Sequence, residues 1–203
     1  MFSRAPLTGM TSFDRHCKVV QDGKEPSFSD GIYAVGRITI KVRRSQDMSL
    51  IDENLKQLGI MLPAAPKPVA AYIPYVEAGG LVYVSGQLPS RDGKVLYSGS
   101  VPKAVDIATA REAARLATIN ALAVVREAVN ADWSRVIRMV RLGVFVQSDP
   151  GFDQQPQIAN GASDLLLSIF GDAGRHARAA VGAAALPLNA VVEVELIVQI
   201  EPI

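Results

Sequence analysis

The stretch from residue 177 to residue 200 restricts the fold more than any other part of the chain. Two apolar runs, 177–181 and 191–198, meet at a Pro/Asn corner, Leu186-Pro187-Leu188-Asn189, which predicts a pair of strands joined by a tight loop. In the second run, Glu193 and Glu195 alternate with apolar residues. Because strand side chains alternate between the two faces of a sheet, both glutamates share one face. That face is either plain solvent-exposed surface or the floor of a polar pocket.

Two helical segments precede this stretch and enclose a further strand. Residues 104–129 contain neither proline nor glycine, are rich in alanine and carry apolar residues three or four apart, which predicts a long amphipathic helix after Pro102. Residues 136–146 predict a strand interrupted by Arg138 and Arg141. Residues 156–170 predict a second helix, whose buried side would hold Ile158, Leu165, Leu166 and Ile169.

The region before the long helix predicts shorter elements. Acidic residues at the start of 50–58, with Ser49 before them and Gly59 after them, predict a short capped helix. The prolines of 62–75 predict an extended, irregular segment. Residues 81–85 then predict a strand, and the Asp-Gly turn at 91–94 predicts a return along 95–97.

This order of elements predicts an α+β fold: one mixed β-sheet with two helices packed on one face. The strand at 136–146 is apolar on nearly every residue, and so is the last strand apart from its glutamates. Two helices can cover only one face of such a sheet. We therefore expect subunits to pack sheet against sheet in a closed homo-oligomer, with sites between the subunits.

Residues 1–47 differ in composition from the rest, with scattered basic residues and little apolar periodicity. Within them, 38–42 predicts a short strand with no obvious partner nearby. We expect the natural protein to begin at Met48, so that 1–47 is an upstream extension without a role in the fold and 48–203 is the folded domain. The alternative is that 1–47 forms a flexible arm.

Composition excludes several classes of protein. Lys and Arg number 21 against 20 Asp and Glu, which argues against nucleic acid as the main partner. One cysteine, Cys17, and two histidines, His16 and His176, exclude an internal disulfide framework and argue strongly against a Cys/His metal cluster. No apolar run approaches the ~20 residues of a membrane span, and the N-terminus lacks a secretory pattern. We expect a cytoplasmic protein.

Several motifs, in this order, resemble the RidA/YjgF family of reactive enamine/imine deaminases, often labelled L-PSP endoribonucleases. They are 84–89 (VSGQLP), 144–146 with Asn160, 177–178 (AR), 186–187 (LP) and 192–195 (VEVE). The similarity spans about 70–200 and keeps near-family spacing. It implies a chorismate-mutase-like (YjgF-type) fold and a homotrimer with three interface clefts. It also implies hydrolysis of 2-imino acids to 2-keto acids and ammonia without any cofactor or metal.

The same resemblance implies roles for individual residues. Arg178 matches an arginine that binds the substrate carboxylate, and Glu193 matches a glutamate near the attacking water. Asn160 matches an asparagine that lines the cleft. Tyr75 and Ser85 match an aromatic wall and a polar lining residue.

Some positions depart from the family pattern. Ala180 stands where many relatives have a cysteine, although in the family it is the peptide group there that contacts the ligand. Ser163 replaces the usual aromatic three residues after Asn160, and the spacing from Asn160 to Arg178 is one residue longer. These departures, the loop at 171–176 and the helix at 49–58 indicate a sub-branch of the family, whose substrate need not be the same.

The chemistry of an imine suits this set of residues. An imine carbon is already electrophilic, so the protein has to hold the substrate, place a water and protonate the leaving amine. A guanidinium binds a carboxylate through two parallel hydrogen bonds, which suits Arg178 to the first task. A carboxylate such as Glu193 can orient water and transfer protons.

Structural roles for the same residues stay open at the level of sequence. Arg178 could be a surface group, and Glu193 could be part of an ion pair at a subunit contact. Glu195 is more typical of a structural ion pair, and a loop histidine such as His176 beside Arg175 is usually incidental. A non-catalytic protein that binds small carboxylates is the main alternative function. RNA cleavage ranks last because the charge is balanced and no basic–aromatic stripe is present.

Overall fold

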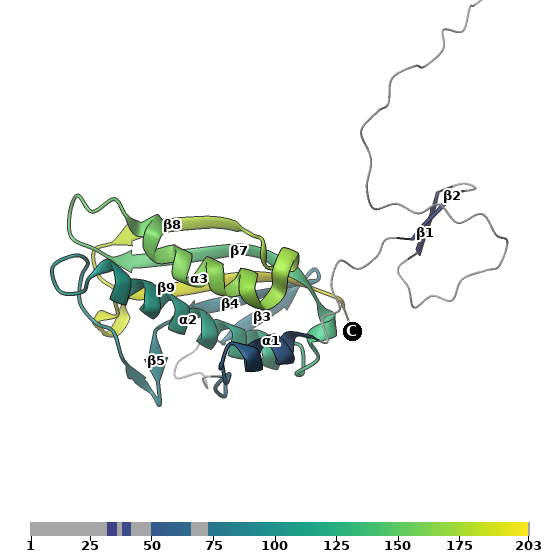
Figure 1. Ribbon diagram of the computed structural model, residues 1–203, viewed down its shortest axis with the longest axis horizontal. Coiled ribbons are helices and arrows are strands. Elements are labelled where there is room, and N and C mark those ends of the chain that lie inside the picture. Colours follow the sequence, from purple (N-terminus) through teal and green to yellow (C-terminus); the bar gives the residue numbers. More distant parts are fainter. Residues whose placement is uncertain (1–31, 36–37, 42–49, 66–72, 203) are drawn as a thin grey trace, which may run out of the picture. The chain divides into compact units, whose positions relative to one another are not determined.

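The computed structural model describes residues 32–35, 38–41, 50–65 and 73–202. The chain divides into two units, Met1–Ser45 and Gln46–Ile203. In the first unit, β1 (Ile32–Val35) and β2 (Ile38–Lys41) form an antiparallel pair, labelled in Figure 1. The strand expected at 38–42 therefore does have a partner, contrary to prediction. The other residues of 1–47, and Ser49, lie outside the described residues.

A five-stranded mixed sheet forms the centre of the second unit, with the strand order β3-β4-β9-β7-β8 (Figure 1). Neighbouring strands are antiparallel except for β7 and β8, which are parallel. The strands are β3 (Tyr75–Ala78), β4 (Leu81–Gln87), β7 (Val136–Gln147), β8 (Ala177–Ala183) and β9 (Val192–Ile200). The predicted α+β class with one mixed sheet is confirmed.

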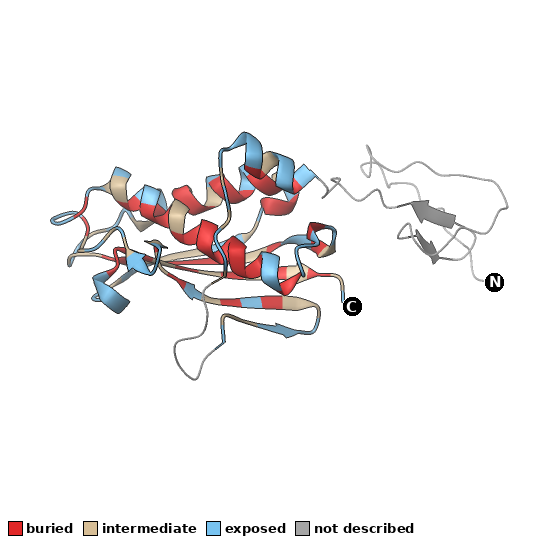
Figure 2. Cartoon of the chain, turned by 90° about the horizontal axis from the view of Figure 1, so that it is seen from below, coloured by how far each residue is buried: buried red, intermediate tan, exposed pale blue. Residues whose placement is uncertain are grey.

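The two long helices cover one face of this sheet, as Figure 2 shows. They are α2 (Ile107–Ala128) and α3 (Gln155–Phe170), and the short α1 (Ile51–Gln57) packs against α3. The helices α2 and α3 approach closely at Gly161, where a Cβ atom would lie 2.1 Å from the backbone oxygen of Arg111. Gly59 ends α1 as predicted: its φ is +66°, and Ile60 N–H donates to the Leu55 carbonyl at 2.8 Å in a Schellman motif.

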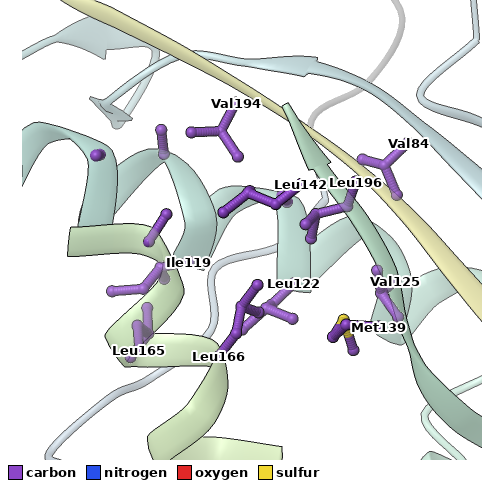
Figure 3. Close-up of a cluster of buried hydrophobic side chains, with 14 of the residues drawn as sticks. Val84, Ile119, Leu122, Val125, Met139, Leu142, Leu165, Leu166, Val194 and Leu196 are labelled. Carbon is purple, nitrogen blue, oxygen red and sulfur yellow. The ribbon is translucent and has the colours of Figure 1, made fainter. Parts of the chain in front are cut away.

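The core lies between the helices and the sheet. Figure 3 shows Leu142, Val194 and Leu196 from the sheet beside Leu122 and Leu166 from the helices. Along β9, burial alternates residue by residue, so the valines face the helices and the glutamates face the other side, as the sequence predicts. Full burial of each large apolar side chain contributes roughly 1.5–3 kcal/mol to folding.

The corner at residues 186–189 does not join two paired strands. The structure places β7 between β8 and β9, so the chain crosses the end of β7 here. The buried side chain of Gln147 holds this crossing: its Nε2 donates to Asn189 Oδ1 at 2.6 Å, and Leu186 N–H donates to its Oε1 at 2.8 Å. The pairing of β8 with β7 instead of β9 is a long-range choice that a local turn motif cannot reveal.

Three other boundaries also differ from prediction. Residues 75–78 form β3, joined to β4 through Gly79 and Gly80, whose φ angles of +59° and +74° suit a two-residue hairpin turn. The return expected at 95–97 is limited to the two-residue strands β5 (Ser90–Arg91) and β6 (Lys94–Val95). The helix α2 begins at Ile107 and not at Ala104, because Asp106 caps it by accepting a hydrogen bond from Thr109 N–H at 2.8 Å.

Candidate functional site

Arg178 lies on β8, the edge strand of the sheet, and its side chain is exposed. Its register partner on β7 is the buried Leu142, which places Arg178 on the side of the sheet that the helices cover. From there, Nη1 donates to Asn160 Oδ1 at 2.8 Å and to Ser163 Oγ at 3.0 Å. Asn160 and Ser163 are three residues apart on α3 and therefore share one helix face. The structure thus brings together Arg178 and Asn160, two of the predicted site residues.

His176 extends this group of polar side chains. Its Nε2 lies 3.1 Å from Ser163 Oγ, and its Nδ1 lies 2.6 Å from the carbonyl oxygen of Gly174. Four polar side chains from α3, β8 and the residue before β8 are thereby linked. We refer to Asn160, Ser163, His176 and Arg178 as the arginine cluster.

Glu193 lies elsewhere, on the sheet face that the helices leave uncovered. Its register partner is Phe145, which alternates with the core-facing residues of β7. The carboxylate lies over Gly86 of β4, so closely that a Cβ atom on Gly86 would be 1.7 Å from Glu193 Oε1. Glycine at this position therefore makes the space that the carboxylate occupies.

The two glutamates of β9 have different electrostatic environments. Glu195 forms an ion pair with Arg141 on β7, as expected for a structural role. Glu193 has no hydrogen bond or ion pair within the described residues. Burial, and secondarily the negative charge of Glu195, raise the pKa of Glu193 above the ordinary carboxyl value. Of the two, Glu193 is the one suited to exchanging a proton.

Arg178 and Glu193 do not meet within one chain. They lie on opposite faces of the sheet, and β7 separates their strands. A ligand that touches both side chains would need contributions from two copies of the chain.

The remaining predicted residues lie in mixed surroundings. Ala180 is two residues beyond Arg178 on the same face of β8, half-buried against the core. Tyr75 pairs with the buried Val84 and also packs against the core. Ser85 Oγ donates to the carbonyl oxygen of Ile73 at 2.8 Å and so holds the segment that leads into β3. Among the described residues, the hydrogen bonds of the Arg178 side chain go to α3 and to none of these three.

A groove of about 1090 Å³ lies beside β4 and α2. Gly86 is part of its wall, and segment 59–64, the hairpin β5–β6 and α2 supply most of the rest. Two smaller cavities lie beside α1 and between α2 and α3. Arg178, Asn160 and Glu193 line none of these three cavities.

The part of the chain that the structure describes contains neither a metal-ligand cluster nor a membrane-spanning helix. There, no cluster of three or more His, Cys, Asp or Glu residues could hold a metal ion. Over the same residues, every helix is too short or too polar to cross a membrane.

Ser163 and His176 are parts of the site that sequence reasoning did not recognise. In sequence, His176 has the features of an incidental loop residue, and Ser163 is only a departure from the family pattern. The spacing of three between Asn160 and Ser163 could have indicated a shared helix face. The position of His176 depends on the short 3₁₀ turn at Gly171–Gly174, which no local pattern specifies.

Comparison with known proteins gives one consistent result. The family model described as "YjgF/chorismate_mutase-like, putative endoribonuclease" matches residues 52–200. Protein TCP17 of Trypanosoma cruzi is 45% identical over 148 residues, which cover 72% of this chain and 92% of that protein. A 2-iminobutanoate/2-iminopropanoate deaminase of Dermatophagoides farinae is 35% identical over 143 residues, covering 70% and 95%.

Solved structures agree with this result. The crystal structure of the protein Atu1372 from Agrobacterium tumefaciens is 46% identical in sequence, with a TM-score of 0.70. The match covers 76% of this chain and 96% of that one. The family model extends over most of the second unit, including nearly all of the strands and helices described above for it. The chain belongs to the RidA/YjgF (YjgF/chorismate mutase-like) family.

Proposed function

We propose that this protein hydrolyses 2-imino acids, formed from reactive enamines, to 2-keto acids and ammonia. The observation that carries the proposal is the contrast between its two charged groups. Arg178 is an exposed guanidinium fixed by α3, and Glu193 is a half-buried carboxylate with a raised pKa and no ion pair within the described residues. The relative named as a 2-iminobutanoate/2-iminopropanoate deaminase supports this reaction type.

The two groups would divide the chemistry between them. Arg178 binds the substrate carboxylate and so holds the imine carbon in place, which is much of the catalysis for so reactive a substrate. Ionised Glu193 takes a proton from water as the water oxygen bonds to the imine carbon and the C=N π electrons move to nitrogen. Protonated Glu193 returns that proton to the nitrogen, which gives a carbinolamine. Glu193 then takes the proton of the carbinolamine hydroxyl and passes it to the amino nitrogen, so that the carbonyl forms as the C–N bond breaks and ammonia leaves. No cofactor is required by this sequence of steps.

We further propose that the site forms between subunits of a homotrimer, and that the protein works in the cytoplasm. The uncovered sheet face carries exposed apolar side chains, including Val76, Tyr83 and Val181. Packing this face against another copy would bury them and would bring Glu193 of one copy toward a neighbouring chain. Arg178 of that neighbour can then complete the cleft.

An assay with a coupled amino acid oxidase tests the proposal. The oxidase generates 2-iminopropanoate. Semicarbazide captures the imine that remains, and the amount captured is compared with the rate of pyruvate release. We expect wild-type protein to accelerate release and Arg178→Ala to lose about tenfold or more in kcat/KM, since a charge-assisted hydrogen bond contributes roughly 1.5–3 kcal/mol. Arg175→Ala, which removes a neighbouring exposed arginine paired with Asp172, is the matched control.

Two outcomes would contradict hydrolysis. Release of pyruvate at the buffer rate by assembled wild-type protein would exclude this substrate. Binding of pyruvate that depends on Arg178, with no turnover of any imine supplied, would instead indicate a carboxylate-binding protein.

A further inference from the structure

The carbonyl of Gly174 determines which atom donates and which accepts in each hydrogen bond of the arginine cluster. A carbonyl oxygen only accepts, so His176 Nδ1 must carry the hydrogen in the 2.6 Å contact. In a neutral imidazole the other nitrogen, Nε2, is then an acceptor. Ser163 therefore donates its hydroxyl hydrogen to Nε2 across 3.1 Å.

This orientation leaves the lone pairs of Ser163 Oγ facing Arg178. Nη1 of Arg178 has two hydrogens, and the structure gives it two acceptors, Ser163 Oγ and Asn160 Oδ1. Both hydrogens on Nη1 are thus engaged. The opposite edge of the guanidinium, formed by Nε and Nη2, makes no hydrogen bond within the described residues. That edge presents two parallel N–H groups, the geometry that a carboxylate accepts.

We propose that Ser163 and His176 are positioning residues for the carboxylate site, acting through Arg178. His176 orients the Ser163 hydroxyl, Ser163 and Asn160 together hold Nη1, and the Nε/Nη2 edge is left facing the ligand carboxylate. The ligand class follows from this geometry: acids whose carboxylate approaches the guanidinium side-on. The inference deepens the proposed function and rests on it.

A purely structural role accounts for the cluster less well. Arg178 is exposed, and exposed polar contacts contribute little to folding stability. Holding a flexible arginine costs side-chain entropy, which offsets part of the gain from its two acceptors on α3, so the fixed geometry contributes little to folding by itself.

The test combines full-length variants with pyruvate as the probe. Ser163→Ala removes one of the two acceptors for Nη1, whereas Ser163→Thr keeps the hydroxyl. His176→Asn keeps a donor for the Gly174 carbonyl and removes the acceptor at Nε2. Titration calorimetry should show pyruvate affinity about tenfold weaker for Ser163→Ala and His176→Asn, given the strength of hydrogen bonds to charged groups. Affinity should return to within about twofold of wild type in Ser163→Thr.

A spectroscopic measurement separates positioning from general support of the fold. Long-range ¹H–¹⁵N spectra of ¹⁵N-histidine-labelled protein at about pH 8, where histidine is ordinarily neutral, should show His176 with its proton on Nδ1 and an acceptor Nε2 that changes in Ser163→Ala. A proton on Nε2 would reverse the chain of hydrogen bonds and overturn the inference.

The outcomes distinguish the two proposals. Wild-type pyruvate affinity in Arg178→Ala would remove the proposed function itself. Loss of affinity in Arg178→Ala, with wild-type affinity in both Ser163→Ala and His176→Asn, would overturn only the positioning role. Circular dichroism melting curves for every variant establish that each one is folded.

Discussion

At the scale of single residues, the candidate site contains two chemically identical groups in different surroundings. Glu193 and Glu195 share one face of β9, yet Glu195 is paired with Arg141 whereas Glu193 lies over Gly86 with no ion pair to the described residues. The sequence shows that the two side chains share a face, because alternation is local. The expectation that Glu195 forms a structural ion pair is confirmed. Its partner could not be predicted, because Arg141 reaches Glu195 from another strand.

The raised pKa of Glu193 predicts that removing its charge will increase stability at high pH and reduce activity. A carboxyl group whose pKa is higher in the folded protein than in the unfolded chain binds its proton more tightly when folded. Stability should therefore fall as pH rises through the range in which Glu193 ionises. Glu193→Gln cannot ionise, so its free energy of unfolding relative to wild type should improve between about pH 4 and about pH 8. Urea unfolding at both pH values measures this difference.

The same variant should lose turnover by about 10²–10⁴-fold, the usual contribution of general acid–base catalysis. A variant that keeps full turnover would remove Glu193 from the chemistry. One whose relative stability worsens toward high pH would contradict the direction of the pKa shift.

Two glycines offer a matched comparison of the glutamates. A Cβ on Gly86 would collide with Glu193 Oε1 at 1.7 Å, and one on Gly143 would meet Glu195 Cγ at 2.5 Å. Gly86→Ala should displace Glu193 and lower kcat by about tenfold or more, since its proton transfer contributes at least that much. Gly143→Ala displaces Glu195 and should change kcat less. Steady-state kinetics of both variants decide, and equal losses would mean that the two carboxylates act as a unit.

At the scale of elements, helices and strands with periodic patterns could be predicted from the sequence, but the long-range pairing of strands could not. The helices α2 and α3 and the strands β7 and β9 follow from patterns within single segments. The crossover that puts β8 beside β7 depends on the buried Gln147, far away in sequence, and could not be predicted from the corner at 186–189. The arginine cluster needs this crossover, because it brings Arg178 to the edge nearest α3.

Close contact between α2 and α3 predicts a large effect of one methyl group. The Cβ of Gly161→Ala would lie 2.1 Å from the backbone oxygen of Arg111, so the helices would have to separate. We expect a loss of roughly 1–3 kcal/mol in the free energy of unfolding, as for other overpacked cores. Ser168→Ala, on an exposed face of the same helix, is the control. Thermal unfolding of the two variants measures the effect, and wild-type stability of Gly161→Ala would show that the helices can adjust.

At the scale of the whole molecule, the uncovered sheet face is the feature that a single chain does not explain. The sequence indicated it through strands that are apolar on both faces, although no local pattern gives the number of subunits. The structure adds where the exposed apolar groups are and shows that Arg178 and Glu193 lie on different faces. Both observations favour assembly as a condition for function.

The role of this face can be tested with two exposed apolar residues of similar accessibility. Val181 on β8 is 46% exposed and shares the face of Glu193, whereas Leu167 on α3 is 41% exposed. Val181→Asp should shift the assembly toward monomers and reduce turnover with it, because a buried unpaired charge is costly. Leu167→Asp should leave both unchanged. Sedimentation velocity gives the masses, and a fully assembled Val181→Asp would exclude this face from the interface.

The position of β7 between the strands of Arg178 and Glu193 also determines how the loss of one of these groups in one copy affects the neighbouring copies. If each cleft takes its arginine from one chain and its glutamate from the next, a copy that lacks either group impairs a cleft it shares with an intact neighbour. Two inactive variants, one without the guanidinium and one without the carboxylate, would then restore activity when they are mixed into one oligomer. Some clefts of the mixed oligomer would contain both an intact arginine and an intact glutamate.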